Sequence, residues 1–150
     1  MPIALVASTS ASAGADTVTT AGINTTGARL LVVEVADGAG TGTLSDSKTN
    51  TWTALTTRGT TAVSRLYYAT NPPVGTAHTF TYALTGGFPA IGVVAYSGAA
   101  TVSPFDVENG AAGSGLTLAT GSVTPSVNNE VVVAGLCFDS VGTITIGSSF

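Results

Sequence analysis

Turn-forming residues interrupt this sequence at intervals of about 8 to 12 residues, and that spacing limits the fold more than any other feature. Between the turns lie short segments rich in Val, Thr and aromatic residues, and none of them shows the 3.6-residue period of an amphipathic helix. Short strands with frequent turns are typical of sandwiches and barrels rather than βαβ units. We therefore expect an all-β fold, an antiparallel, jelly-roll-like β-sandwich of about 8–10 strands.

The clearest predicted strands are two apolar runs of strand length, residues 29–36 and 90–97, and one alternating segment, residues 77–84. In the alternating segment one face carries His78, Phe80, Tyr82 and Leu84, and we expect this face in the core. Further strands are predicted at residues 3–7, 16–23, 41–45, 51–57, 63–69, 116–123, 130–138 and, as the start of another strand, 143–146.

The polar cluster at residues 46–50 separates two of these segments. Its Asp46 and Asn50 side chains can hydrogen-bond to their own backbone in a turn. The sequence therefore predicts a hairpin that joins residues 41–45 to residues 51–57.

The chain divides into an N-terminal arm, residues 1–15, and a sandwich domain, residues 16–150. Within the arm, residues 3–7 are a first short strand and residues 8–15 are a linker of Ser, Ala and Gly, which we expect to reach a neighbouring subunit. The alternating pattern that begins at Gly142 has only started at Phe150, so we expect further residues or another chain to complete the sandwich.

Charged residues make up only 8% of the chain, against about 25% in an average domain. The four basic residues are scattered, which excludes a cationic track for nucleic acid. No apolar run approaches the ~20 residues that span a membrane. Because a surface so poor in charge resists association weakly, we expect a homo-oligomer.

Four short motifs carry a family resemblance that covers residues 29–138. They resemble recurring β-sandwich, jelly-roll-like domains of bacteriophage structural proteins and bacterial surface proteins. The resemblance implies a sandwich that serves as a fibre, a decoration or a sugar-binding module. The motifs are LSDSKTNTW at residues 44–52, LYYA at 66–69, AYSGA at 95–99 and SPFD at 103–106.

The inventory of reactive residues predicts no catalytic, cofactor-binding or metal site. His78 is the single histidine and lies on a core-facing strand face, Ser114 lacks the spacing of a nucleophile elbow, and Cys137 reads as a small core residue. The glycine-rich run at residues 38–42 lacks the lysine and helix of a phosphate loop. One alternative stays open, a calcium site built from Asp37, Asp46, Asn50 or the pair Asp106 and Glu108.

Taken with the resemblance, these features favour a non-enzymatic phage virion protein, most plausibly a capsid decoration or cement protein. We expect its partners to be the major capsid protein or other virion subunits, and copies of itself in a trimer. Residues 1–7 lack the basic start and long apolar core of a signal peptide, so we expect assembly into virions in the host cytoplasm.

The alternative function is a tail or fibre component, or a carbohydrate-binding adhesive module at a cell surface. Such a module would use exposed aromatic rings. The candidate interface or ligand-facing residues are Trp52, Tyr67 and Tyr96.

Overall fold

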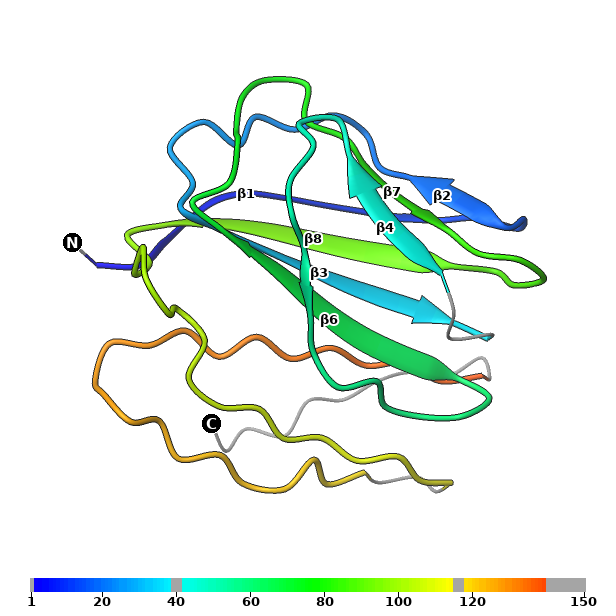
Figure 1. Cartoon of the computed structure of the whole chain (residues 1–150). Coiled ribbons are helices and arrows are strands. Elements are labelled where there is room, and N and C mark those ends of the chain that lie inside the picture. The colour runs from blue at the N-terminus through cyan, green and yellow to red at the C-terminus, as the bar shows by residue number, and fades with distance from the viewer. Residues whose placement is uncertain (1, 39–41, 115–117, 140–150) are drawn as a thin grey trace.

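The computed structural model describes residues 2–38, 42–114 and 118–139, and in them eight strands form two antiparallel sheets (Figure 1). The predicted all-β antiparallel sandwich is confirmed, and no helix occurs in these ranges. The larger sheet, sheet A, has the order β1 (Ala4–Ser12), β8 (Ala90–Ser97), β3 (Leu30–Asp37), β6 (Val63–Thr70), β5 (Thr53–Ala54). The smaller, sheet B, has the order β2 (Thr17–Thr19), β7 (Phe80–Ala83), β4 (Thr43–Asp46).

The main core lies between the two sheets. From sheet A it takes the inward-facing side chains of β3, β6 and β8, and from sheet B it takes Val18, Phe80 and Tyr82. β-Branched and aromatic side chains fill this space because they suit the pleated surface of a strand. No part of the described chain forms a helix long and apolar enough to cross a membrane.

The strongest strand predictions are confirmed. The runs at residues 29–36, 63–69 and 90–97 correspond to β3, β6 and β8, and the alternating segment contains β7. The face predicted to be in the core is buried at all four positions, His78, Phe80, Tyr82 and Leu84.

The predicted hairpin around residues 46–50 is wrong. Strand β4 pairs with β7 in sheet B, whereas β5 pairs with β6 in sheet A. The polar turn is present, but the chain crosses from one sheet to the other after it, because Trp52 packs against the core between the sheets.

The predicted N-terminal linker is also wrong over most of its length. Residues 8–12 belong to β1 and pair with residues 90–94 of β8. Small side chains carry little apolar surface, but backbone pairing is enough to hold them at the edge of a sheet.

The outer face of sheet A, the one turned away from sheet B, is partly covered by the C-terminal segment, residues 102–114 and 118–139 (Figure 1). Val133 of this segment packs against a small cluster on that face. The cluster consists of Leu30, Val32, Leu66, Tyr68, Val94, Tyr96, Ala99 and Val133.

Two strand predictions in the C-terminal segment are not confirmed. Residues 130–138 are not assigned to a strand, although exposure alternates from residue to residue as in one. Residues 118–123 are exposed and irregular, while residues 115–117 and the predicted start of a strand at 143–146 lie outside the described residues. Cys137 is half-buried rather than a core residue, because it belongs to the segment that only partly covers sheet A.

Candidate functional site

The densest polar cluster in the described chain surrounds the carboxylate of Asp46, at the end of β4. Its Oδ1 accepts hydrogen bonds from the Lys48 N–H at 2.8 Å and the Asn50 side chain at 3.0 Å. Its Oδ2 accepts from the Asn50 N–H and from the Trp52 indole N–H, both at 3.0 Å. The polar turn predicted from Asp46 and Asn50 is therefore built around one side chain.

His78 connects this carboxylate to the N-terminal part of the chain. Its Nε2 lies 2.9 Å from Asp46 Oδ1, and its Nδ1 lies 2.9 Å from Thr25 Oγ1. The imidazole stacks on Phe80 with 4.2 Å between ring centroids. Thr25, His78 and Asp46 thus form a buried chain of hydrogen bonds, in which the side chains of His78 and Asp46 have no solvent contact.

Thr25 is also hydrogen-bonded to Gly75. The Gly75 N–H donates to Thr25 Oγ1, and the Thr25 N–H donates to the Gly75 carbonyl. The Thr25 hydroxyl lies within hydrogen-bond distance of two acceptors, the Gly75 carbonyl at 3.2 Å and His78 Nδ1 at 2.9 Å. These bonds hold the segments of Thr25, Gly75 and His78 together in the interior of the protein.

The pKa of Asp46 reflects this environment. Burial on its own raises the pKa of the carboxyl, but the hydrogen bonds from His78, Lys48, Asn50 and Trp52 together outweigh it. The net result is a pKa below the ordinary value of 3.8. Asp46 is therefore a stable carboxylate, with its acceptor sites used by the protein.

The order threonine, histidine, aspartate is that of a nucleophile, its base and an orienting acid, but here the three side chains are enclosed in the protein. Thr25 and His78 are both fully buried, so a substrate cannot reach the hydroxyl. The cluster instead ties together three segments that are distant in sequence, at Thr25, Asp46 and His78. Sequence reasoning missed Thr25, although a histidine on a core-facing strand requires a buried partner.

Of the oxygen ligands considered for calcium, the structure brings Asp46 and Asn50 together, and there the Asn50 amide donates to the carboxylate. Asp37 accepts from the Tyr82 hydroxyl at 2.9 Å, in the core and apart from the Asp46 turn. Asp106 accepts from the Ser126 N–H at 2.7 Å, and Glu108 accepts from Thr56. The described residues contain no group of three His, Cys, Asp or Glu side chains that could hold a metal ion.

The three candidate aromatic residues lie on two faces of sheet A. Trp52 packs against the main core, in a T-shaped pair with Phe80 at 6.2 Å between centroids. Tyr67 is buried in the same core, beneath the Arg65 guanidinium at 5.3 Å. Tyr96 belongs to the cluster on the outer face. The rings therefore do not form one platform.

The other two predicted features have separate outcomes. Ser114 is exposed, whereas His78 is fully buried, and no hydrogen bond joins the two side chains in the described chain. Most of the glycine-rich run at residues 38–42 falls outside the described residues, because positions 39–41 are not among them.

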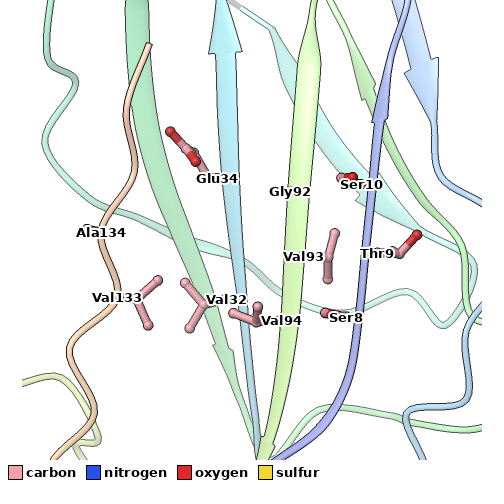
Figure 2. A pocket seen from close by; sticks show the side chains of 10 residues that line it. All are labelled: Ser8, Thr9, Ser10, Val32, Glu34, Gly92, Val93, Val94, Val133 and Ala134. Atoms are coloured by element: carbon pink, nitrogen blue, oxygen red, sulfur yellow. The ribbon is translucent and has the colours of Figure 1, made fainter. Parts of the chain in front are cut away.

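A second polar site lies on the outer face of sheet A, in a cavity of about 340 Å³ next to the C-terminal segment. Figure 2 shows Glu34 on β3 at this cavity, with Val133 and Ala134 on one side and the serines of β1 on the other. Gly92, in the middle of β8, lies between Glu34 and Ser10 in the register of the sheet. An added Cβ at Gly92 would contact nothing, so this glycine leaves the sheet surface open there.

Glu34 has fewer donors than Asp46. The Ser64 hydroxyl donates to it at 3.2 Å, and the Leu136 N–H also donates to it. Burial raises the pKa of Glu34 above 4.5, and these two hydrogen bonds only partly oppose it. Burial, together with the charges of Glu34 and Asp37, also raises the pKa of the Cys137 thiol, which lowers its reactivity.

The geometry thus gives two polar sites, one buried around Asp46 and one at the outer face of sheet A, next to Glu34 and the serines of β1. Comparison of the chain with protein-family models, curated proteins and solved structures finds no match. Arguments about function therefore rest on the chain's own residues.

Proposed function

We propose that this chain is a non-enzymatic structural protein of a bacteriophage virion, which acts as a decoration or cement protein by binding other virion subunits. The observation that carries the proposal is the apolar surface of residues 131–138. In this extended stretch the odd-numbered residues face sheet A, and Val132, Leu136 and Phe138 face away with 64%, 44% and 46% of their surface exposed.

An exposed apolar surface of this kind favours contact with another protein. The stretch is apolar on both sides, so one side can cover sheet A while the other binds a neighbouring subunit. Val102, Phe105 and Val107 add exposed apolar side chains in the same C-terminal segment.

The low charge of the chain supports the same proposal. With only 8% charged residues and a net charge of −4, the surface offers little electrostatic opposition to close packing in an assembly. Contacts of modest strength, repeated over the symmetric positions of a shell, stabilise the whole particle.

The buried network supports the non-enzymatic part of the proposal. The single histidine uses both ring nitrogens in hydrogen bonds inside the protein, and Thr25 and Asp46 use their side chains there as well. These groups contribute to the stability of the sandwich, and none of them faces the apolar surface of residues 131–138.

The test is a comparison of phage particles with and without this chain. We expect purified virions to contain it, and particles from a deletion strain to open at lower temperature until purified chain is added back. A double variant, Leu136→Ser with Phe138→Ser, should fold but restore little stability, whereas Phe88→Ser, at an exposed phenylalanine in the β7–β8 loop, should restore it fully.

Two results decide against the proposal. Virions without any copy of the chain would exclude a virion role, and full rescue by the double variant would exclude residues 131–138 as the contact. Electron microscopy of labelled particles separates a shell protein from the tail or fibre component that the sequence left as the alternative.

A further inference from the structure

Strand β1 is the longest strand of the sandwich and lies at the edge of sheet A. It has nine residues, whereas the edge strands β5, β2 and β4 have two, three and four. No described strand pairs with its outer side. Edge strands of stable monomers usually carry a lysine, a proline or an inward charge that prevents pairing with another chain.

Such protection is weak in β1. Its sequence, ALVASTSAS, contains no charged residue and no proline. A shift in register between Leu5 and Ala7 interrupts the strand near its start, but residues 7–12 pair regularly with residues 90–95 of β8. The regular part of β1 is therefore open to a further strand.

The direction of the backbone groups follows from two hydrogen bonds. The Ala13 N–H donates to the Pro89 carbonyl at 3.0 Å. The backbone N–H and C=O groups of the odd-numbered residues of β1 therefore point toward β8. On β8, the Tyr96 carbonyl accepts from the Arg29 N–H next to β3, so the backbone groups of even-numbered residues point toward β3 and those of odd-numbered residues point toward β1. The N–H and C=O groups of Ser8, Ser10 and Ser12 therefore point away from the sheet.

Five of the six residues in the regular part of β1 also form a palindrome. Residues 7–11 read Ala-Ser-Thr-Ser-Ala in both directions, with Thr9 at the centre. If two copies pair antiparallel about Thr9, alanine faces alanine, serine faces serine and threonine faces threonine. The outward backbone groups then match as well, because Ser8 of one copy faces Ser10 of the other in a hydrogen-bonded pair.

This match identifies the partner as a second copy of the chain. A two-fold interface requires a surface that is complementary to itself, and the palindromic residues 7–11 meet that condition at each of their positions. The absence of charge in residues 1–15 means that no like charges meet across the axis. The small side chains also let the two backbones approach to hydrogen-bonding distance.

We propose that β1 pairs antiparallel with β1 of a second copy, about a two-fold axis at Thr9, so that the two A sheets become one continuous sheet. The resulting assembly is a dimer and differs from the trimer predicted from the sequence. The inference does not rest on the virion role, because it concerns the isolated chain.

The first test measures the dimer directly. The full chain should sediment as a dimer, and the double variant Ser8→Lys, Ser10→Lys should raise the dissociation constant by about tenfold or more, since lysines meet twice across the axis. The matched variant Ser8→Glu, Ser10→Glu should be weakened alike, and a mixture of the two should recover as a heterodimer. Lysines at Thr43 and Ser45, on the edge strand β4, should leave the dimer unchanged.

The second test fixes the register and works even if the lysine variant folds poorly. In a Cys137→Ser background, Thr9→Cys places two thiols at a non-hydrogen-bonded pair, where Cα atoms lie about 4.5 Å apart, within disulfide range. Oxidised glutathione should take up the two electrons and two protons as the disulfide forms. Ser12→Cys is the control, because the axis places its two copies about 20 Å apart.

Each outcome decides the proposal. Dimers that cross-link through Cys at position 9 and not at position 12 support it. A chain that stays monomeric at high concentration, or a dimer in which position 9 does not cross-link, overturns it.

Discussion

Two carboxylates of this sandwich, Asp46 and Glu34, are removed from solvent in similar ways and respond in opposite directions. Burial raises the pKa of both, yet the pKa of Asp46 is lowered and that of Glu34 is raised. Asp46 accepts five hydrogen bonds, including those from His78 and Trp52, whereas Glu34 accepts from Ser64 and Leu136. The difference follows from the number of donors, because the hydrogen bonds to Asp46 outweigh the effect of its burial and the two to Glu34 do not. Glu34 lies on the outer face of sheet A, which is covered only in part.

The largest expected effect comes from removing the better satisfied acid. Asp46→Ala leaves the donors on His78, Trp52 and the 48–50 turn without an acceptor inside the protein, so we expect a loss of about 3–5 kcal/mol in the free energy of unfolding. Urea denaturation measures it. The control is Asp16→Ala, at an exposed carboxylate that accepts from the Gly86 and Gly87 N–H groups, with an expected loss of about 1 kcal/mol.

The same network predicts a pH dependence. Because the pKa of Asp46 is lower in the folded protein than its ordinary value of 3.8, its stabilisation is fully present above pH 3.8 and is lost as pH falls through the folded pKa. Asp46→Asn should remove this acid-sensitive part of the stability curve. An unchanged curve in that variant would mean that another group causes the loss.

The sequence predicts the part of the molecule that lies between the sheets. Segments such as residues 90–97 and 77–84 signal their strands and their buried faces because hydrophobic pattern and strand period agree there. The sequence also predicts the turn at Asp46. It does not predict that β4 and β5 join different sheets, because no local feature shows it. It does not predict either that Thr25, 53 residues before His78, completes the network.

The third prediction compares the two sides of β3 with one kind of substitution. Val33 is 0% exposed in the main core, and its neighbour Val32 is 8% exposed on the outer face beneath Val133. We expect Val33→Ala to lower the free energy of unfolding by about 2–3 kcal/mol and Val32→Ala by about 1 kcal/mol. The loss is smaller for Val32 because loosely packed neighbours can move into the space that the side chain leaves. Thermal unfolding of the two variants measures the difference. Equal losses would mean that the outer face is packed as tightly as the core.

The C-terminal segment marks the limit of prediction from sequence. Residues 130–138 have the composition of a buried strand, but a strand also needs a neighbour to pair with, and composition does not supply one. Glu34 was equally hidden, because a lone acid in an apolar run gives no sign of what lies over it. Gly135 shows how close that cover is, since an added Cβ there would lie 2.7 Å from the Glu34 carboxyl carbon.

The smallest expected effect concerns Glu34 and has the opposite sign to that of Asp46. Because the pKa of Glu34 is higher in the folded protein than its ordinary value of 4.5, the folded state binds more protons between these two values, and stability falls as pH rises through that window. Glu34→Gln removes the charge but keeps an acceptor for Ser64 and Leu136. We therefore expect the variant to have the same free energy of unfolding as the parent protein near pH 4. At neutral pH its free energy of unfolding should be higher, by less than about 1 kcal/mol. Urea denaturation across this pH range measures the gap. A variant that is less stable at neutral pH would show that the charged form of Glu34 holds the C-terminal segment in place. The Glu34 carboxylate would then have more stabilising contacts than the two hydrogen bonds from Ser64 and Leu136.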